Sequence, residues 1–424
     1  MRNTSIWPRL LGLEKTVVED VQIEDGTLVA RVRLRANARL RCSRCLRRSP
    51  RYDQGHGRRR WRHLDAGTLQ VWLEANAPRV SCRDCGVNVA HVPWARAGAG
   101  HTFDFDQQVS YLATTMNKSA VSYLMRIAWR TVGAIVARYW QDVEDVFDRF
   151  ENITRIGIDE ISYKKGHRYL TIAVDHDSGR LLWAAPGRDI ETLAEFFRLL
   201  GPERCAAITL VSSDAASWIK AAVGQHCPNA VLCADPFHVV AWATDALDEQ
   251  RRTAWNNAAG RNRFRLSAPE SSRSQGHAKS LKATRYALWK NPDNLTDHQR
   301  HQIEWIAKTD PRLYRAYLLK EALRYVFAVK GEQGREALEA WIAWAQRCRL
   351  PAFTLLAKKI KKNREAIDAT LHHGLSNALI ESTNTKIRVI TRTAFGFADP
   401  EALIALAMLS LGGYKPTLPG RADA

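Results

Sequence analysis

Three acidic residues in the second half of the chain have the types and the order that metal-dependent chemistry needs. Asp159 and Asp214 each end an apolar, strand-like stretch, and Glu381 lies on an expected helix near the C-terminus. Because both aspartates follow apolar strands, we expect their carboxylates to project at the same edge of a sheet. Three converging carboxylates need counterions, and hard oxygen ligands favour Mg²⁺ or Mn²⁺.

Such a metal centre would act on phosphodiester bonds. Two ions about 4 Å apart could clamp the attacking and leaving oxygens of a phosphodiester. Arg388 lies two helical turns beyond Glu381 on the same face, where it could hold the DNA backbone near the metals. A single aspartate at a strand end is more often a turn cap, so the order of the three acids on the strand pattern carries this prediction.

Four cysteines form a second candidate metal site. They occur as two CxxC pairs, Cys42 with Cys45 and Cys82 with Cys85. Each pair is a tight knuckle with two thiolates, and two knuckles complete a closed structural zinc site. The 36 residues between the pairs exceed the usual zinc-ribbon spacing, so we expect a long intervening hairpin. The alternatives are a redox motif, which needs no duplicate, or two coincidental pairs.

Regular patterns indicate the elements that would position these residues. Alternation over 16–40 predicts a hairpin, helical periodicity covers 104–140, and 237–372 contains no convincing strand and reads as a helical insertion. The serine-rich stretch Ser267–Ser274 is expected to be a loop. Between these segments the order β-β-β-α-β-α-β predicts a mixed α/β sheet. The strands of this sheet are expected at 155–159, 169–175, 181–185, 206–213 and 230–234. Helices are expected at 190–200 and from 215, and a last helix at 376–390 is expected to pack back on the sheet.

Residues 119–140 fit a helix-turn-helix. A short helix at Ser119–Met125 is followed by a turn and by a second helix at Trp129–Arg138. The apolar face of the second helix would pack inward and leave Arg130, Thr131 and Arg138 outside for DNA. The alternative is an ordinary three-helix bundle.

The charge distribution favours a polyanionic ligand. The net charge is +19, and residues 31–62 hold thirteen arginines against the single acid Asp53, whereas residues 151–250 carry 9 basic and 14 acidic side chains. Arginine suits phosphate contacts, so double-stranded DNA around a carboxylate centre is the expected partner. The arginines predicted to contact DNA are Arg44, Arg47, Arg48, Arg58, Arg59, Arg60 and Arg62.

Length and hydropathy exclude several other classes. A chain of 424 residues predicts two to four domains. No stretch approaches about 18 consecutive apolar residues, and the first residues have no apolar signal core, so we expect neither a membrane span nor secretion. The expected location is the bacterial cytoplasm, in association with the nucleoid.

Several motifs in a fixed order resemble the ISL3 family of bacterial insertion-sequence transposases, a branch of the DDE transposases. The motifs in the second half are Ile156–Glu160, Ser212–Asp214, Asp235–His238, Asn377–Glu381 running to Arg388, and Thr393–Phe397. The N-terminal motifs are Arg60–Asp65, Cys82–Gly86 and Val92–Arg96.

This resemblance implies a catalytic triad of Asp159, Asp214 and Glu381. It also implies auxiliary active-site roles for Asp235 and His238, which form an Asp-x-x-His motif, and for Lys386 and Arg388. Glu160 is a rival ligand to Asp159, but strand alternation would point it to the other face, and the family alignment favours Asp159.

The implied fold class is multidomain α+β: a zinc-binding β domain, a helix-turn-helix, and an RNase-H-like α/β catalytic domain interrupted by an all-helical insertion. The implied activity is binding of terminal inverted repeats, with metal-dependent strand cleavage and strand transfer and no covalent protein–DNA intermediate. Pairing of two ends implies a homodimer or a larger synaptic complex. The expected domains are 1–100 (zinc finger), 101–150 (helix-turn-helix and linker), 151–236 (first catalytic part), 237–372 (insertion) and 373–424 (final catalytic part).

Two other functions remain open from the sequence. One is a domesticated DNA-binding regulator without catalysis, although such a protein could lose the three acids freely. The other is a different RNase-H-like nuclease, although such enzymes are generally smaller and lack this domain arrangement.

Overall fold

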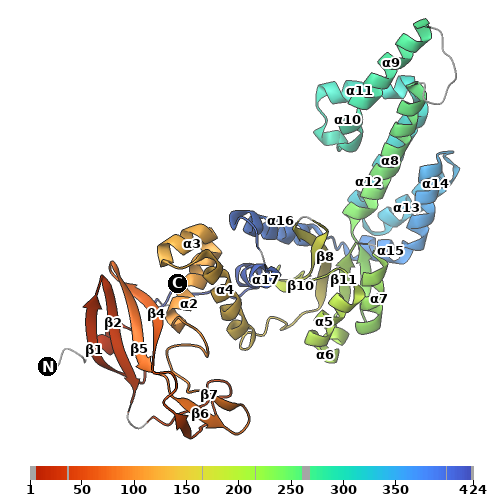
Figure 1. The fold of residues 1–424 in the computed structure, drawn as a ribbon. Helices are drawn as coiled ribbons and strands as arrows, with labels where there is room; N and C mark the ends of the chain where they lie inside the picture. The colour runs from red at the N-terminus through yellow and green to blue at the C-terminus, as the bar shows by residue number, and fades with distance from the viewer. Residues whose placement is uncertain are drawn as a thin grey trace. The chain divides into compact units, whose positions relative to one another are not determined.

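The computed structural model of the protein describes residues 6–35, 38–164, 166–214, 216–259, 268–397 and 399–421. Contacts within the chain divide it into two compact units. The first unit consists of Met1–Arg149 together with Val389–Ala424, and the second consists of Phe150–Arg388. Figure 1 shows the elements of both units, and each unit is described by itself.

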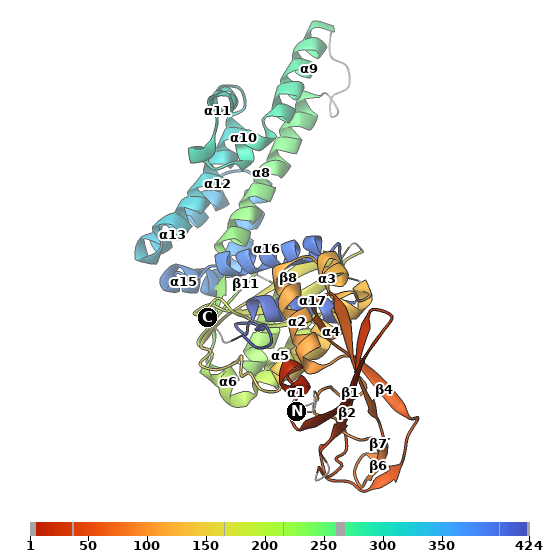
Figure 2. The same ribbon diagram turned by 90° about the vertical axis from the view of Figure 1, so that its left-hand side faces the viewer.

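A four-stranded sheet forms the N-terminal part of the first unit (Figure 2). The predicted hairpin is present as β1 and β2, which are joined by Asp25 and Gly26, both at positive φ, as the twist of a two-residue hairpin requires. A second hairpin, β4 and β5, pairs through β5 with β2. The strands are β1 (Thr16–Glu24), β2 (Thr27–Leu34), β4 (Arg58–Ala66) and β5 (Leu69–Asn76), in the order β1-β2-β5-β4.

A smaller sheet carries one cysteine knuckle. It consists of β3 (Arg51–Asp53), β6 (Arg79–Cys82) and β7 (Gly86–Val89). The hairpin of β4 and β5 lies between the two CxxC pairs in sequence, as the long spacing predicts.

Three helices follow in the first unit: α2 (Phe103–Thr115), α3 (Lys118–Met125) and α4 (Trp129–Glu144), after the short α1 (Trp7–Leu10) near the N-terminus. Thr102 and Asn117 accept backbone N–H bonds at the starts of α2 and α3. Arg126 ends α3 in the left-handed conformation, which makes the turn before α4. The predicted helix-turn-helix is therefore present, with a second helix longer than expected.

The last part of the chain is divided between the two units. The apolar helix α17 (Pro400–Leu411) packs against α4 and α2, so Val389–Ala424 is grouped by its contacts with the first unit. The expected final catalytic part, 373–424, therefore spans both units, and a uniformly apolar helix does not reveal from its sequence which surface covers it.

A five-stranded mixed sheet forms the base of the second unit. Its strands are β8 (Arg155–Lys164), β9 (Arg168–Asp175), β10 (Leu181–Pro186), β11 (Leu210–Ser213) and β12 (Val231–Ala234), in the order β10-β9-β8-β11-β12. β8, β9 and β10 are antiparallel neighbours, whereas β11 is parallel to both β8 and β12. The helices α5 (Ile190–Leu200), α6 (Pro202–Ala207) and α7 (Ser217–His226) connect them. The strand expected at 206–213 begins only at Leu210, because α6 takes its first residues.

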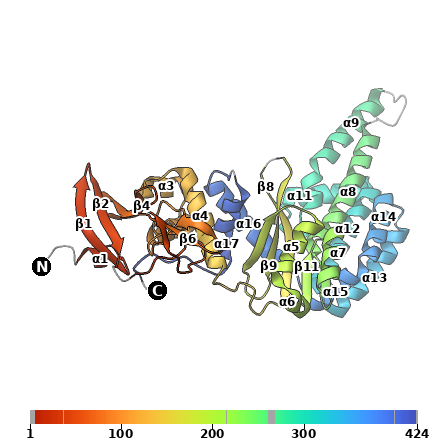
Figure 3. The same cartoon turned by 60° about the horizontal axis from the view of Figure 1, so that its bottom comes forward.

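Between β12 and α16 the described chain is helical, as predicted for 237–372. A large apolar core holds these helices together. α12 and α14 pack against α8, as Figure 3 shows for α14. The predicted loop at Ser267–Ser274 is wrong from residue 268 onward, where α9 begins; Ser267 lies outside the described residues. The elements are α8 (Pro236–Ala258), α9 (Ala268–Ala283), α10 (Arg285–Trp289), η2 (Pro292–Asn294), α11 (Asp297–Thr309), α12 (Pro311–Val329), α13 (Gly331–Arg347), α14 (Pro351–Lys362), α15 (Arg364–His373) and α16 (Ala378–Thr393).

No helix within the described part of the chain has both the length and the apolar composition needed to cross a bilayer.

Candidate functional site

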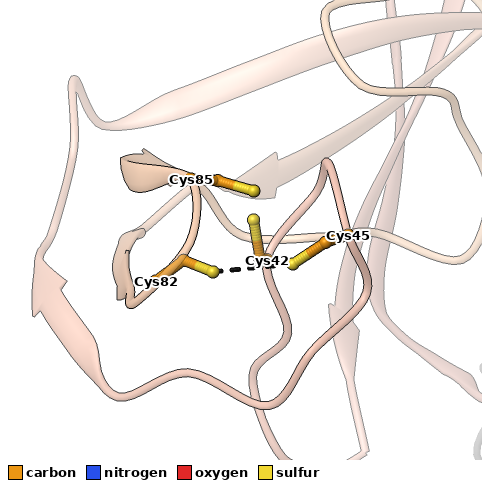
Figure 4. A group of neighbouring side chains, drawn as sticks. All are labelled: Cys42, Cys45, Cys82 and Cys85. Carbon is orange, nitrogen blue, oxygen red and sulfur yellow. Dashed lines mark hydrogen bonds between the residues drawn. The ribbon is translucent and has the colours of Figure 1, made fainter.

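The four cysteines of the two knuckles come together in the first unit (Figure 4). Their sulfur atoms all lie within 4.8 Å of one another, and the sulfurs of Cys45 and Cys82 are 3.5 Å apart. A tetrahedral ion with Zn–S bonds of about 2.3 Å places its sulfurs about 3.8 Å apart, so this cluster has the right size for zinc.

Backbone amides favour the thiolate form of one cysteine in this cluster. The amides of Cys85 and Asp84 lower the pKa of Cys82 to about 6, whereas the hydrogen bond with the Cys45 thiol raises the pKa of Cys85 to about 12. The amide of Arg44 points at the sulfur of Cys42 at 3.4 Å. All eight cysteines are free thiols, so the knuckles are not disulfide bridges.

Three aspartates of the second unit lie in register across its parallel strands. Asp214 and Asp235 directly follow β11 and β12, but Asp159 lies within β8. The prediction that a strand ends at Asp159 is wrong, because β8 continues to Lys164 through its pairing with β9. Ser213 in β11 is paired with Ile158 in β8 and with Ala234 in β12. The next residue after each of these positions is an aspartate: Asp159, Asp214 and Asp235. Because the three strands are parallel, the register brings these acids to neighbouring positions.

Asp159 is held by two hydrogen bonds. Its Oδ1 accepts from the backbone N–H of Glu160 at 2.7 Å, and its Oδ2 accepts from the side-chain amide of Asn384 at 2.7 Å. Burial raises the pKa of Asp159, the Glu160 amide and His238 oppose this effect, and the charge of Asp214 adds to it. The negative charge of Asp214 therefore disfavours the charged form of Asp159. A cation bound near both carboxylates would offset this repulsion.

A glycine allows α16 to approach β8 closely near Asp159. A Cβ on Gly157 would lie 2.1 Å from Cδ1 of Ile380, so a larger residue at this position would have to displace the Ile380 side chain. The contact places the start of α16 over the strand that carries Asp159. Glu381 follows Ile380 directly, but its side chain is exposed.

Asp235 is a buried cap rather than an exposed acid. Its Oδ1 accepts from the backbone N–H of Phe237 at 3.4 Å and of Asn377 at 3.3 Å. It therefore ties the start of α8 to the residue that precedes α16. Its Oδ2 is 3.9 Å from Nδ1 of His238.

The structure brings only part of the predicted site together. The four cysteines are the only group of three or more metal-binding side chains in the described ranges whose ligand atoms are close enough to share one ion. The carboxylates of Asp159, Asp214 and Glu381 are thus not gathered to that distance. Lys386 and Arg388 are exposed on α16.

Glu160, the rival to Asp159, is paired with a cation. Nε of Arg188 lies 2.8 Å from its Oε2. Burial raises the pKa of Glu160, Arg188 opposes this, and the charges of Asp214 and Asp159 raise it further.

Two of the arginines predicted to contact DNA are used inside the first unit. Arg62 is only 2% exposed and donates to the backbone oxygens of His63 and Val71 while pairing with Asp65. Arg138 donates to Asp106 at 2.9–3.1 Å. These guanidinium groups are satisfied within the fold, so we do not carry either residue forward as a DNA contact.

The other predicted DNA contacts remain at the surface to different degrees. Arg58 and Arg60 are exposed but pair with Glu74, each at 2.9 Å, and Arg59 lies over the ring of Trp61. Thr131 is half-buried. The remaining exposed residues are Arg44, Arg47, Arg48 and Arg130, of which Arg47 pairs with Asp84.

Sequence reasoning missed two asparagines. Asn384 donates a hydrogen bond to Asp159. The backbone N–H of Asn377 binds Asp235, and its buried side-chain amide has no hydrogen-bond partner among the described residues. The signal for Asn384 was its position three residues after Glu381, which puts both on one helix face.

Comparison with known proteins identifies the family of the chain. Residues 156–407 match a family model described as a transposase, residues 38–85 match the zinc finger of the transposases of IS204, IS1001, IS1096 and IS1165, and residues 90–140 match the helix-turn-helix domain of transposase family ISL3. The chain belongs to the ISL3 family of transposases, as the sequence motifs predict.

Among its relatives is the transposase for insertion sequence element IS1557 from Mycobacterium tuberculosis. The two are 60% identical over 99% of this chain and 98% of the relative. The transposase for insertion sequence element IS1001 from Bordetella parapertussis is 28% identical over 81% of this chain and 82% of the relative.

Proposed function

We propose that the protein binds the terminal inverted repeats of an insertion sequence in double-stranded DNA and catalyses metal-dependent strand cleavage and strand transfer. Asp159, Asp214 and Glu381 would hold the metal ions in an RNase-H-like catalytic domain interrupted by the helical segment. The observation that carries this proposal is the strand register that aligns Asp159 with Asp214, with α16 packed over the same strand.

The donor set suits Mg²⁺ or Mn²⁺, because it consists of carboxylate oxygens. Bound there, the ions would activate the attacking water or 3′-OH and neutralise charge on the phosphorus oxygens. Asn384 holds one carboxylate oxygen of Asp159, which fixes its rotamer. Glu381 lies one turn before Asn384 on α16, so this bond would hold the helical turn that carries Glu381 close to β8.

Two further residues would position this centre. Asp235 binds the backbone of Asn377 and so fixes the start of the helix that carries Glu381. His238 acts electrostatically on Asp159 and favours its charged form, which is the form that binds a cation. Lys386 and Arg388, exposed on the same helix, would contact the DNA backbone.

A cleavage assay tests the catalytic part. The substrate is a labelled duplex that carries the element's own terminal repeat, with Mg²⁺ or Mn²⁺. We expect cuts at the repeat boundary from the wild type and none from Asp159→Asn, Asp214→Asn or Glu381→Gln, each of which should still bind the repeat. Asp177→Asn is the control, because this acid pairs with Arg155 at the start of β8.

The outcomes separate the alternatives. Full cleavage by any of the three variants would remove that residue from the active site. Strand transfer into a target plasmid supports a transposase, whereas nicking without transfer supports another nuclease. Binding without any cut, even with paired ends, supports a regulator. Sedimentation of the protein on paired ends would test the expected dimer or larger complex.

We also propose that the cysteine cluster holds one structural Zn²⁺ and that the Arg-rich segment around it, with the exposed Arg130, contacts DNA. Purified protein should contain one zinc per chain, and Cys82→Ser should lose it together with the order of the small sheet. Cys348→Ala is the control, because this cysteine lies in the helical core of the other unit. A wild-type protein without zinc would refute the assignment.

A further inference from the structure

A groove in the second unit opens beside Asp214. It has a volume of about 240 Å³ and lies where the start of α7 and the end of β12 meet the turn between α14 and α15. All of its lining residues belong to the second unit. The groove therefore joins the sheet edge of the aspartates to the helical segment.

Three lysines line this groove: Lys220 on α7 and Lys359 and Lys362 on α14. All three are exposed, and no direct ion pair to a carboxylate is seen for them in the ranges that the structure describes, although the charge of Asp245 acts on Lys359. Besides Asp214, Glu365 is the only acid in the lining. Three ammonium groups against two carboxylates leave the groove with a net positive charge, which favours a polyanion.

The groove is held in a fixed shape. Thr370 on α15 donates its hydroxyl to the backbone oxygen of Ala234 at 2.7 Å, which fixes α15 to the end of β12. Nζ of Lys359 lies 3.6 Å from the ring centroid of Trp242 on α8. This cation–π contact orients the Lys359 side chain while leaving the residue exposed.

The backbone geometry also suits an anion. Ser217, the first residue of α7, and Ala216 before it line the groove. The Ala216 N–H donates to Oδ1 of Asp214 at 3.3 Å, and the N-cap position itself has no side-chain cap among the described contacts. The turn of Asn363 leads into α15, whose start has no side-chain cap either. Helix N-termini carry partial positive charge, which adds to the field of the three lysines.

We propose that this lysine groove (Lys220, Lys359 and Lys362) binds the sugar–phosphate backbone of a DNA strand next to the phosphodiester that is cut at Asp214. The inference rests on the proposed function, because only a cleaved strand must pass beside Asp214. Lysines are mobile point charges that contact phosphates rather than base edges. The groove therefore contributes affinity without sequence preference, whereas the helix-turn-helix would supply recognition.

The test uses two duplexes and the full-length protein. The junction duplex contains the terminal repeat with flanking DNA across the cleavage site, and the inner duplex contains only the inner part of the repeat. The test variant replaces Lys220, Lys359 and Lys362 with glutamine. The control variant carries Lys358→Gln and Lys361→Gln, because these exposed lysines lie on the same helix outside the groove lining.

We expect the test variant to bind the junction duplex with a shallower salt dependence. Each lost phosphate contact reduces the slope of log Kobs against log salt by about 0.9, so three contacts reduce it by about 3. The test variant should keep the wild-type slope on the inner duplex. The control variant should keep the wild-type slope on both duplexes. Replacement of the three lysines by arginine should restore it, which shows that charge, and not folding, is responsible.

An unchanged slope on the junction duplex would overturn the proposal, as would equal losses on both duplexes. Wild-type cleavage is measured on the same junction duplex. A reduced slope with no cleavage would leave the groove as a DNA site and reject the catalytic function. Normal cleavage with an unchanged slope would reject the groove alone.

Discussion

Asp106→Asn should destabilise the first unit strongly. The Asp106 side chain is 0% exposed at the start of α2 and lies between two arginines. Arg138 donates to both of its oxygens at 2.9–3.1 Å, and Nη1 of Arg96 donates to Oδ2 at 2.7 Å. The substitution keeps the shape of the side chain but removes its negative charge. Among the described contacts, no other carboxylate is hydrogen-bonded to both of these guanidinium groups.

The magnitude follows from burial. Removing one partner of a buried ion pair costs about 3–5 kcal/mol, because the other charge stays desolvated without compensation. Arg138 is only 27% exposed, so water replaces little of the lost interaction. For domains of 150–250 residues, each kcal/mol lowers Tm by about 2–4 °C, so the expected decrease is roughly 6–20 °C.

The control is a second acid on the same arginine. Asp142 on α4 pairs with Nε of Arg96 but is 47% exposed. An exposed pair contributes about 0–1 kcal/mol, so Asp142→Asn should change Tm by at most about 4 °C. Thermal unfolding of both variants by circular dichroism and calorimetry measures the difference. Equal shifts would refute the argument that burial of Asp106, rather than ion pairing in general, stabilises the helix-turn-helix.

Three other measurements follow from the same structure. Arg130→Gln should weaken repeat binding at constant Tm, whereas Arg138→Gln should lower Tm; the reverse pattern in binding and melting assays would restore Arg138 as a DNA contact. Burial lowers the pKa of His63 from 6.5 to about 4. Between these pH values the unfolded chain binds a proton at this residue and the folded chain does not. The free energy of unfolding should therefore decrease by up to about 3 kcal/mol as pH falls from 6.5 to 4. Denaturant unfolding across this range checks it, and a His63→Gln variant with the same pH dependence would contradict it. Asn384→Ala should slow cleavage about 10–100-fold, since a hydrogen bond to a charged group contributes about 1.5–3 kcal/mol. It should also move the acid limb of the pH–rate profile to higher pH, because the Asn384 hydrogen bond lowers the pKa of Asp159. An unmoved profile would leave Asn384 with a structural role only.

Features that depend on local sequence were predictable. The β1–β2 hairpin follows from alternation around Asp25 and Gly26, and the succession of strands and helices along the second unit follows from apolar runs separated by turn residues. The cysteine cluster follows from the spacing of the two pairs, because a CxxC knuckle is a local geometry. Each of these signals lies within a short stretch of chain.

Features that depend on distant partners were not predictable. Arg62 and Arg138 look like other members of a basic sequence, and only the fold shows that acids face them from Asp65 and Asp106. The contact of Asn384 with Asp159 joins positions 225 residues apart. Nothing in the composition of α17 indicates that it packs on α4.

The distribution of charge in the second unit has a physical consequence for its site. Residues 151–250 carry more acids than bases, and uncompensated carboxylates at the sheet edge would repel a DNA strand. Lys220 comes from within this acidic stretch, while Lys359 and Lys362 come from a helix more than a hundred residues later, and all three line the groove beside Asp214. Folding thus places positive charge next to the carboxylates without pairing with them. In the proposed function, the acids would be available for cations, and the lysines would be available for the phosphates beside the bond to be cut.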